Sequence, residues 1–547
     1  MSKARLRLRG GKLYDPTNGT SGTVRDVCIE DGRIVASLPD DAPTLDVTGM
    51  LVMPGGVDMH AHIAAGSVNQ SRRLLPESHH PAGAPQLVRG NWLPRSGSDG
   101  IVPTTFTTGY RYAGLGYTTV FDAAVAPSDA RHAHAELDDT PIIDAGFYTL
   151  LGNDAYLLHL LATGARDRAR DYAAWVLNTT CAYAIKVVNP GGVELWKRNV
   201  RQVEGLDTPV GSDRVTPRVI LETLADAANA LSLPHALHIH GNRLGEAGNV
   251  ETTLASMSAL DGRRAHFTHV QFHSYETGWR SGARRVMEYV NAHPEVSIDV
   301  GQVMFGPAVT VTADGAVEYL LHKSSGKKWV NIDIELETGC GIVPYEYRDR
   351  AAVAALQWVV GLELFLLAAD PWRVALSTDH PNGGSFLSYP ELIRLLMDKP
   401  YRDECLSRVN PKLIAGSALV DGIGREYTLD EIAIITRAAP ARLLGLTNKG
   451  HLGPGADADI TVYAEGENAA VTFTSPRYVF KRGVMVVEEG ALRRAPRGRR
   501  LYVQPSSDSA FRRHLKQWWS ENATMAFENF GAGPLSDAPT EARGAAR

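Results

Sequence analysis

Two histidines separated by one residue, His60 and His62, are the first side chains of this sequence with the type and spacing of metal ligands. They end the stretch LVMPGGVDMHAH, in which an apolar run and a Pro-Gly-Gly break precede them. Alternate residues of a β-strand point to the same face, so both imidazoles would lie on one side, with Asp58 behind them. Two neutral imidazoles that converge on one point are typical of a transition-metal site. An isolated pair of this kind is more often a chance surface feature, so further ligand residues elsewhere in the chain are needed to indicate a metal site.

Further chemically active side chains lie at or near the ends of strand-like segments. They are Lys186 in AYAIKVVNPGG, His238 and His240 in HALHIHGNRLG, His266, His269 and His273 in HFTHVQFHS, and Asp379 and His380 in VALSTDHPNGG. Singly, each has a structural explanation: a buried lysine pairs with a carboxylate, strand histidines are satisfied core residues, and an aspartate at a strand end caps a turn. Because such groups follow one strand after another, we expect them to share one metal site.

The elements that position these residues alternate between short apolar runs and longer helical patterns. Predicted strands include TTVFDAA, AYAIKVV, HALHIHG, HFTHVQF, VSIDVG, WVNIDIEL and RVALSTD, and predicted helices include PRVILETLADAANALSL and AAVAALQWVVGLELFLLAA. This alternation predicts an α/β fold, a (β/α)8-type barrel with insertions, in which catalytic groups lie at the C-terminal ends of the strands. An open doubly wound sheet is the alternative, but no GxGxxG follows a first strand.

The two ends of the chain share a different pattern, short alternating strands between turns. We expect residues 1–55 and 450–505 to form one appended β-sandwich domain, residues 56–449 to form the barrel, and residues 506–547 to form a C-terminal helix and flexible tail. The aromatic residues Trp518, Trp519 and Phe527 of this last segment are expected to pack on the barrel, with a partner protein as the alternative.

The composition is that of an ordinary globular enzyme. Of 547 residues, 44% are hydrophobic and 21% charged, and a net charge of −5 gives no reason to expect nucleic acid or a membrane as partner. Four cysteines without CxxC spacing argue against a disulfide framework and against a cysteine-bound metal. The start of the chain lacks the apolar region of a signal peptide, so we expect a cytoplasmic location.

The order His-x-His, Lys, His, His, Asp between two halves of a terminal β-domain resembles the amidohydrolase superfamily. The stretches VMPGGVDMHAH and GHLGPGADADITVY are similar to the boundaries of its barrel. PTTFTTGYRYAGLGYTTV, AYAIKVVNPGG, THVQFHSY, DVGQV, TADGAVEY and ELETGCGIVPYEYR resemble the hydrolase subunit of formylmethanofuran dehydrogenase. They resemble equally the hydrolase subunit of the bacterial formyltransferase/hydrolase complex, and this similarity runs from about residue 5 to residue 505.

The resemblance implies a site with two zinc ions bridged by a carboxylated Lys186. A carbamate is an anionic oxygen donor, whereas a free ammonium is a poor ligand. The implied metal ligands are His60, His62, Lys186, His238, His269 and Asp379. On the fifth strand His238 is the preferred ligand, and His240, nearer the strand end, is the alternative.

The implied reaction is the reversible hydrolysis of the formamide bond of N-formylmethanofuran to formate and methanofuran. The chain would act as the hydrolase subunit of a complex, with a methanofuran-type coenzyme as substrate and the other subunits as partners. Asp379 would carry the proton, and His240 or His380 would stabilise the oxyanion. The expected substrate contacts are Asn189, Gln271, His273, His380 and Arg72, the last in a long loop after His62 that also holds His79 and His80.

Two other functions stay open at this point. One is a cyclic-amide hydrolase of the dihydroorotase or hydantoinase kind, which shares the metal ligands but not the stretches YAIKVVNPGG, THVQFHSY and ELETGCGIVP. The other is a non-catalytic scaffold within a complex, a role that the presence of all candidate ligands argues against.

Overall fold

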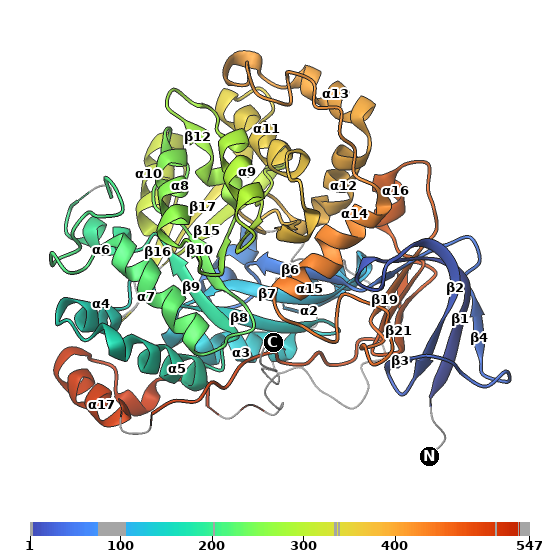
Figure 1. Ribbon diagram of the computed structural model, residues 1–547, viewed down its shortest axis with the longest axis horizontal. Helices are drawn as coiled ribbons and strands as arrows, with labels where there is room; N and C mark the ends of the chain where they lie inside the picture. The colour runs from blue at the N-terminus through green and yellow to red at the C-terminus, as the bar shows by residue number, and fades with distance from the viewer. Residues whose placement is uncertain are drawn as a thin grey trace.

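Eight parallel strands form the centre of the molecule in the computed structural model, which describes residues 4–74, 105–200, 203–332, 336, 340–508, 511–533 and 535 (Figure 1). In sheet order they are β6 (Gly56–Ala61), β7 (Tyr117–Val125), β8 (Asp144–Leu150), β9 (Ala184–Val188), β10 (Leu237–His240), β11 (Ala265–Phe267), β14 (Val296–Asp299) and β18 (Val374–Ala375). A parallel bridge between Ala61 and His380 closes the ring, and the His62 N–H donates to the His380 carbonyl at 2.7 Å. The predicted barrel is confirmed.

Helices surround this barrel, and most of them bury apolar side chains. The main ones are α2 (Thr105–Gly114), α3 (Ala130–Asp139), α4 (Ala155–Ala162), α5 (Ala169–Thr180), α6 (Gly192–Lys197), α7 (Pro217–Ala230), α8 (Asn249–Ala259), α9 (Ala283–Ala292), α11 (Ala352–Leu366), α12 (Tyr389–Met397), α13 (Lys399–Arg408), α14 (Leu429–Ala433) and α15 (Ala439–Leu443). Helix α7 shows how the sequence defines such an element. Thr216 caps it by accepting the Val219 N–H, proline occupies its first turn, and Ile220, Leu224 and Ala228 recur on its buried side.

Strands from both ends of the chain form one nine-stranded sheet beside the barrel (Figure 1, right). The N-terminal members are β1 (Arg5–Asp15), β2 (Thr20–Glu30), β3 (Arg33–Val35), β4 (Thr44–Asp46) and β5 (Leu51–Pro54), and the C-terminal members are β19 (Ile460–Tyr463), β20 (Tyr478–Lys481), β21 (Val484–Glu488) and β22 (Ala491–Leu492). Antiparallel pairing of β5 with β19 joins the two halves. The predicted appended β-domain is therefore confirmed, whereas its sequence limits stay a prediction.

A small antiparallel sheet is inserted between β14 and β18. It consists of β15 (Gly306–Thr312), β16 (Val330–Ile332) and β17 (Cys340–Tyr347), with α10 (Gly315–Ser325) between its first two strands. The prediction that WVNIDIEL contributes a barrel strand is wrong, because β16 pairs with β17 in this insertion. The barrel uses β8 instead. A short apolar run looks the same in either sheet, and only the pairing partner distinguishes them.

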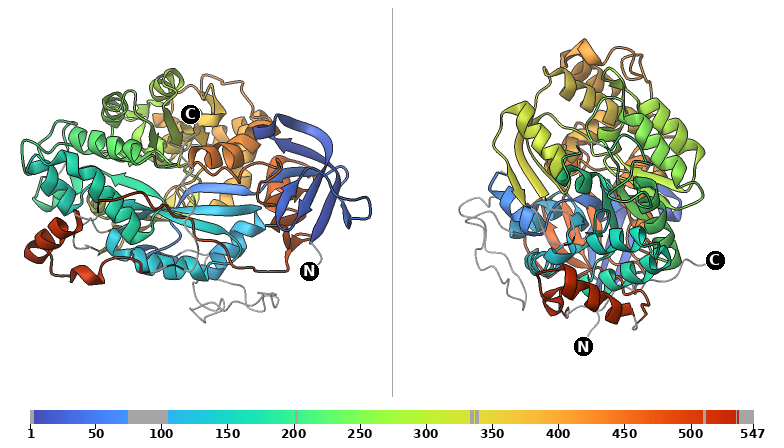
Figure 2. Two further views of the ribbon diagram at one scale, coloured as in Figure 1. Left: turned by 60° about the horizontal axis from the view of Figure 1, so that its bottom comes forward. Right: turned by 90° about the vertical axis from the view of Figure 1, so that its left-hand side faces the viewer.

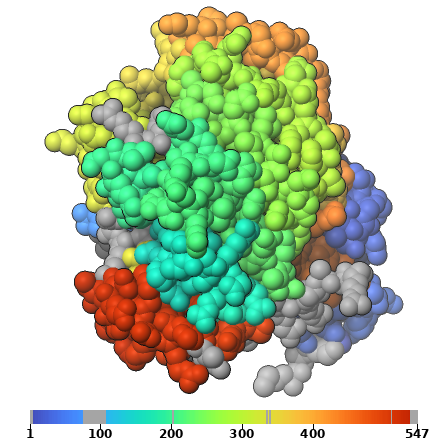
Figure 3. Space-filling model, turned by 60° about the vertical axis from the view of Figure 1, so that its left-hand side comes forward, coloured from blue at the N-terminus to red at the C-terminus, as the bar shows by residue number. Residues whose placement is uncertain are grey.

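The C-terminal helix α17 (Phe511–Asn522) packs on the outside of the barrel against α4 and α5 (Figure 2). Trp518 lies edge-on to Tyr156, with 4.9 Å between ring centroids, and Phe527 stacks on Trp175 at 5.6 Å. The surface view shows this segment in red directly against the teal barrel helices (Figure 3). These aromatic residues therefore pack on the chain's own barrel, as expected from the sequence. Among the described helices, none combines the length and apolarity needed to cross a membrane.

Candidate metal centre

The carboxyl ends of the barrel strands open into a cavity of about 540 Å³. Six of the sequence-predicted residues line it: His60, His62, Lys186, His240, His269 and Asp379. The outer wall comes from the inserted sheet, α10 and α11 and is largely apolar, with Leu321, Tyr345, Tyr347 and Val353 among its residues. Such a pocket has the size and lining of a small-molecule site, with its polar groups gathered at the bottom.

One group of ligand atoms comes from the first and last barrel strands. His60 Nε2 lies 3.0 Å and His62 Nε2 3.2 Å from the same oxygen, Oδ1 of Asp379. Asp379, four residues after the end of β18, adopts a left-handed backbone conformation (φ 52°), which is uncommon for a residue with a side chain. Two imidazole nitrogens and a carboxylate oxygen at one point form a donor set suited to a divalent transition metal.

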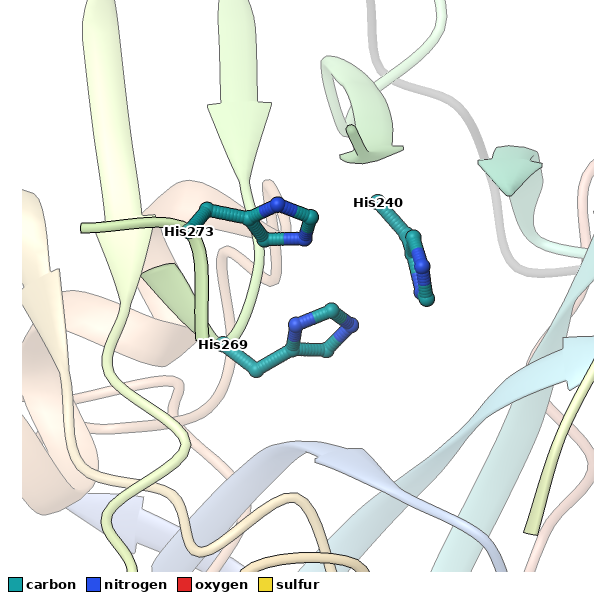
Figure 4. A group of neighbouring side chains, drawn as sticks. All are labelled: His240, His269 and His273. Carbon is teal, nitrogen blue, oxygen red and sulfur yellow. The ribbon is translucent and has the colours of Figure 1, made fainter. Parts of the chain in front are cut away.

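A second group consists of His240, His269 and His273, whose rings face one another (Figure 4). Their ring centroids are 4.6 Å (His240–His269), 5.3 Å (His240–His273) and 5.4 Å (His269–His273) apart. Burial lowers the pKa of all three imidazoles, so they are neutral at pH 7. Within the described part of the chain, His269 Nδ1 and both ring nitrogens of His273 have no hydrogen-bond partner, and the nearest carboxylate to His240 Nε2, that of Asp314, lies 3.7 Å away. Buried nitrogens of this kind fit a metal ion, which would satisfy them.

Lys186 lies in the middle of β9 at the floor of the cavity and is 1% exposed. Burial lowers the pKa of its amine to about 7, although the nearby Asp299 and Asp379 oppose the shift. Part of the population is therefore an uncharged amine at neutral pH. An uncharged amine has the lone pair needed to add carbon dioxide, so the environment of Lys186 fits the carbamate that the resemblance implies.

The two histidines of β10 lie at different depths. His240 ends the strand and lines the cavity, whereas His238 pairs with Lys186 one step earlier in the β-register. Both nitrogens of His238 are engaged: Nε2 lies 2.9 Å from His60 Nδ1, and Nδ1 lies 2.9 Å from His235 Nε2. The choice between them stays a prediction: His238 belongs to a group of possible ligand atoms with His60 and Asp299, whereas His240 lines the cavity.

The remaining predicted substrate contacts do not line the described cavity. Arg72 donates to the Ile63 carbonyl and to Glu136, and Asn189 accepts from the side-chain amide of Asn242 at 2.8 Å. Gln271 accepts from the Tyr275 hydroxyl at 3.0 Å, while the ring of His380 lies against Phe386. Their contact with substrate stays a prediction. His79 and His80 lie outside the described residues.

Sequence reasoning missed two acidic residues at this site, Asp299 and Glu318. Asp299 ends β14, as Asp379 follows β18, so a carboxylate within the predicted strand VSIDVG, near its C-terminal end, was the available signal. Glu318 belongs to the inserted helix α10 and lines the cavity, and burial raises the pKa of its carboxyl well above the ordinary value. No sequence signal marked Glu318, because the insertion was taken for part of the barrel.

Comparison with known proteins gives a consistent result over most of the chain. The model of the family "Amidohydrolase family" matches residues 44–492. Protein FwdA of Methanocaldococcus jannaschii is 43% identical over 518 residues, which cover 91% of this chain and 90% of FwdA. An Fhc subunit of the formyltransferase/hydrolase complex of Methylorubrum extorquens is 38% identical over 541 residues, covering 96% of this chain and 95% of that subunit. A chain in the crystal structure of the M. extorquens formyltransferase/hydrolase complex with methylofuran superposes with a TM-score of 0.91 at 36% identity, covering 98% of this chain and 99% of that chain.

Proposed function

Because the chain belongs to the amidohydrolase family, we propose that it hydrolyses the formamide bond of N-formylmethanofuran, reversibly, to formate and methanofuran. It would do so as the hydrolase subunit of a one-carbon formyltransferase/hydrolase complex. The observation that carries this proposal is the convergence of His60, His62, Lys186, His240, His269 and Asp379 at the floor of one cavity.

These donor atoms would supply two neighbouring metal positions. His60, His62 and Asp379 would hold one ion and His240 and His269 the other, with the carboxylated Lys186 as a further ligand. His269 also groups with His60 and Asp379, so the two positions would lie close together. When bound, two divalent ions lower the pKa of water and polarise the amide carbonyl. Zinc suits this imidazole-rich set.

The chain's own groups would perform the remaining steps. Asp379, which contacts both His60 and His62, is placed to accept a proton from the attacking water and to return it to the departing amine. His273 lies beside the second metal position, where an imidazole would contact the bound formamide. The apolar residues of α10 and β17 would exclude bulk water from the reacting bond.

The relatives support the substrate and the partners. Similarity to the Fhc subunit extends over nearly the whole of both chains, so the surfaces that it uses in its complex have counterparts here. That complex was crystallised with methylofuran, a coenzyme of the class proposed for this chain.

The test is formate release from N-formylmethanofuran by the purified chain, alone and with its partner subunits, with Asp379→Asn measured beside it. We expect wild type to release formate and the variant to lose about 10²–10⁴-fold in kcat while it keeps most of its metal. Opening of a cyclic amide without formate release would identify the other hydrolase class. If even the assembled complex turns over neither substrate, the non-catalytic scaffold role would be the remaining explanation.

A further inference from the structure

Asp299, at the end of β14, contacts residues of both metal positions. The side chain is completely buried, and its Oδ2 lies 3.2 Å from His60 Nδ1, 3.1 Å from His266 Nε2 and 2.6 Å from the hydroxyl of Thr268. Its other oxygen, Oδ1, accepts the backbone N–H of His269 at 2.8 Å. One carboxylate thus contacts the His60 ring at Nδ1, on the side away from the first metal position. It also contacts the backbone N–H of His269, which belongs to the second.

The hydrogen on His60 can be assigned from its neighbours. A chain of three imidazoles runs from His60 Nδ1 to His238 Nε2 (2.9 Å), from His238 Nδ1 to His235 Nε2 (2.9 Å), and from His235 Nδ1 to the Leu443 carbonyl (2.8 Å). A carbonyl only accepts, so His235 Nδ1 carries a hydrogen and, in a neutral ring, Nε2 accepts. The same reasoning repeated at His238 leaves the hydrogen of His60 on Nδ1.

Asp299 leads to the same assignment from the opposite end. The Thr268 hydroxyl donates to Asp299 and also contacts His60 Nδ1, so it accepts from that nitrogen, which in addition lies 3.2 Å from the carboxylate. Both ends of the chain of imidazoles therefore require Nδ1–H on His60 and leave the lone pair on Nε2, the atom that points toward Asp379 in the cavity. In the opposite tautomer the His60 Nδ1 lone pair would face the Asp299 carboxylate. Reversing all three rings to match would leave a lone pair of His235 against the Leu443 carbonyl, which would then lack its donor.

The contact between Asp299 and His269 concerns the backbone conformation of His269. His269 has a left-handed backbone (φ 34°) immediately after β11, and its N–H is held by Asp299 Oδ1. Gly301, two residues after Asp299, leaves room for it, since a Cβ there would lie 2.3 Å from the His269 Cβ. The direction in which His269 enters the cavity thus depends on β14.

We propose that Asp299 is a positioning residue that sets the tautomer of His60 and the backbone of His269, with His238 behind it as a hydrogen-bond acceptor and not a metal ligand. This inference rests on the proposed two-metal site. One buried carboxylate would then hold ligands of both metal positions in place. Residues in such a supporting role typically change metal affinity by about 10- to 100-fold when replaced.

The test measures metal affinity without substrate, by competition with a chromophoric zinc chelator, and the absorption spectrum of the Co²⁺-loaded protein. Asp299→Asn keeps the shape but offers one acceptor oxygen where two are needed. We expect its zinc dissociation constant to rise about 10- to 100-fold, with an altered cobalt spectrum. The control is Asp154→Asn, an equally buried carboxylate that caps α4 and bonds Tyr172, where asparagine is also a good cap. It should retain wild-type affinity.

A second pair of variants keeps the inference testable should Asp299→Asn fail to fold. In His238→Gln the amide oxygen replaces Nε2 as acceptor, so zinc affinity should stay within about threefold of wild type, whereas His238→Leu removes the acceptor and should weaken it. Wild-type affinity in Asp299→Asn, equal loss in both His238 variants, or equal retention in both would overturn the inference. So would a wild-type chain that binds no metal. Loss of affinity in a protein that releases no formate would uphold it while rejecting the proposed substrate.

Discussion

The two ends of the barrel each hold a buried cluster of ionisable residues, and the two clusters differ in how their charges are balanced. At the end where the strands begin, Asp144, Asp457 and Asp459 surround Lys449, whose Nζ lies 2.7 Å from Asp144, 3.2 Å from Asp457 and 2.7 Å from Asp459. Lys481 adds contacts of 2.8 Å to Asp459 and 3.0 Å to Asp144. Arg499 contributes a third cation at 3.0 Å from Asp144.

At the end where the strands finish, acceptors outnumber donors. Neutral imidazoles and Asp379 face Lys186, whose pKa is lowered to about 7, and several ring nitrogens among the described residues have no partner. The first cluster is complete because its own lysines neutralise its carboxylates. The second would be completed by the metal ions proposed above. Three carboxylates close enough to hold an ion are therefore not a metal site when lysine nitrogens already occupy the centre.

The largest expected effect is that of metal removal. Dialysis against a chelator should abolish formate release, and two equivalents of Zn²⁺ per chain should restore it, because the proposed hydrolysis needs both metal ions. Metal analysis together with the activity assay checks this. Asp144→Asn, at the opposite end, should still bind two ions, and a third ion in wild type that disappears in this variant would contradict the comparison.

Lys186→Ala should lower formate release by more than about 100-fold, the upper end for residues that only support a ligand. The control, Lys481→Met, should keep its metal. In wild type, reloading of the metal-free protein should require carbon dioxide, because only the uncharged amine forms a carbamate. Since that amine has a pKa of about 7, the rate of reloading should rise from pH 6 to pH 8 and then level off. Reloading that is independent of both pH and carbon dioxide would exclude the carbamate.

Lys449→Met should lower the free energy of unfolding by about 3–5 kcal/mol, because it leaves buried carboxylates without their central cation. The effect is measured by urea unfolding of the metal-free protein. Lys12→Met, which breaks an exposed pair with Glu465, should leave the free energy of unfolding nearly unchanged. Metal content should not change in either variant, and a loss of zinc in Lys449→Met would mean that the two clusters are not independent.

The smallest effect is expected for Glu318→Gln in the cavity wall. Burial raises the pKa of the Glu318 carboxyl above its ordinary 4.5, so the folded protein holds this proton over a pH range in which the unfolded chain has lost it. Stability contributed by this group therefore falls as pH rises above about 4.5, and glutamine removes that cost. The variant should melt at a higher temperature than wild type at pH 7 and at the same temperature near pH 4. An equal difference at both pH values would show that packing, not protonation, is responsible.

The sequence predicted the architecture well because its signals are local. The alternation of strands and helices identified the barrel, and matching strand patterns at both termini identified the appended sheet. WVNIDIEL was misassigned because its apolar pattern is the same in a barrel strand and in the antiparallel insertion. Only pairing with β17, a contact between distant segments, reveals its position.

The sequence by itself determined which residues face the cavity from the first, fourth, sixth and eighth strands, since spacing and strand ends are properties of the chain. Only the tertiary structure decided how deep each side chain lies in the barrel and which distant residues it contacts. His238 and His240 share one face of one strand, and no local pattern tells which reaches the cavity. The difference depends in part on a neighbour distant in the sequence: His60 and the nearby His235 engage both nitrogens of His238, whereas His240 lines the cavity. Asp299 is a residue of the same kind, because its role depends on contacts to two other strands that the sequence does not record.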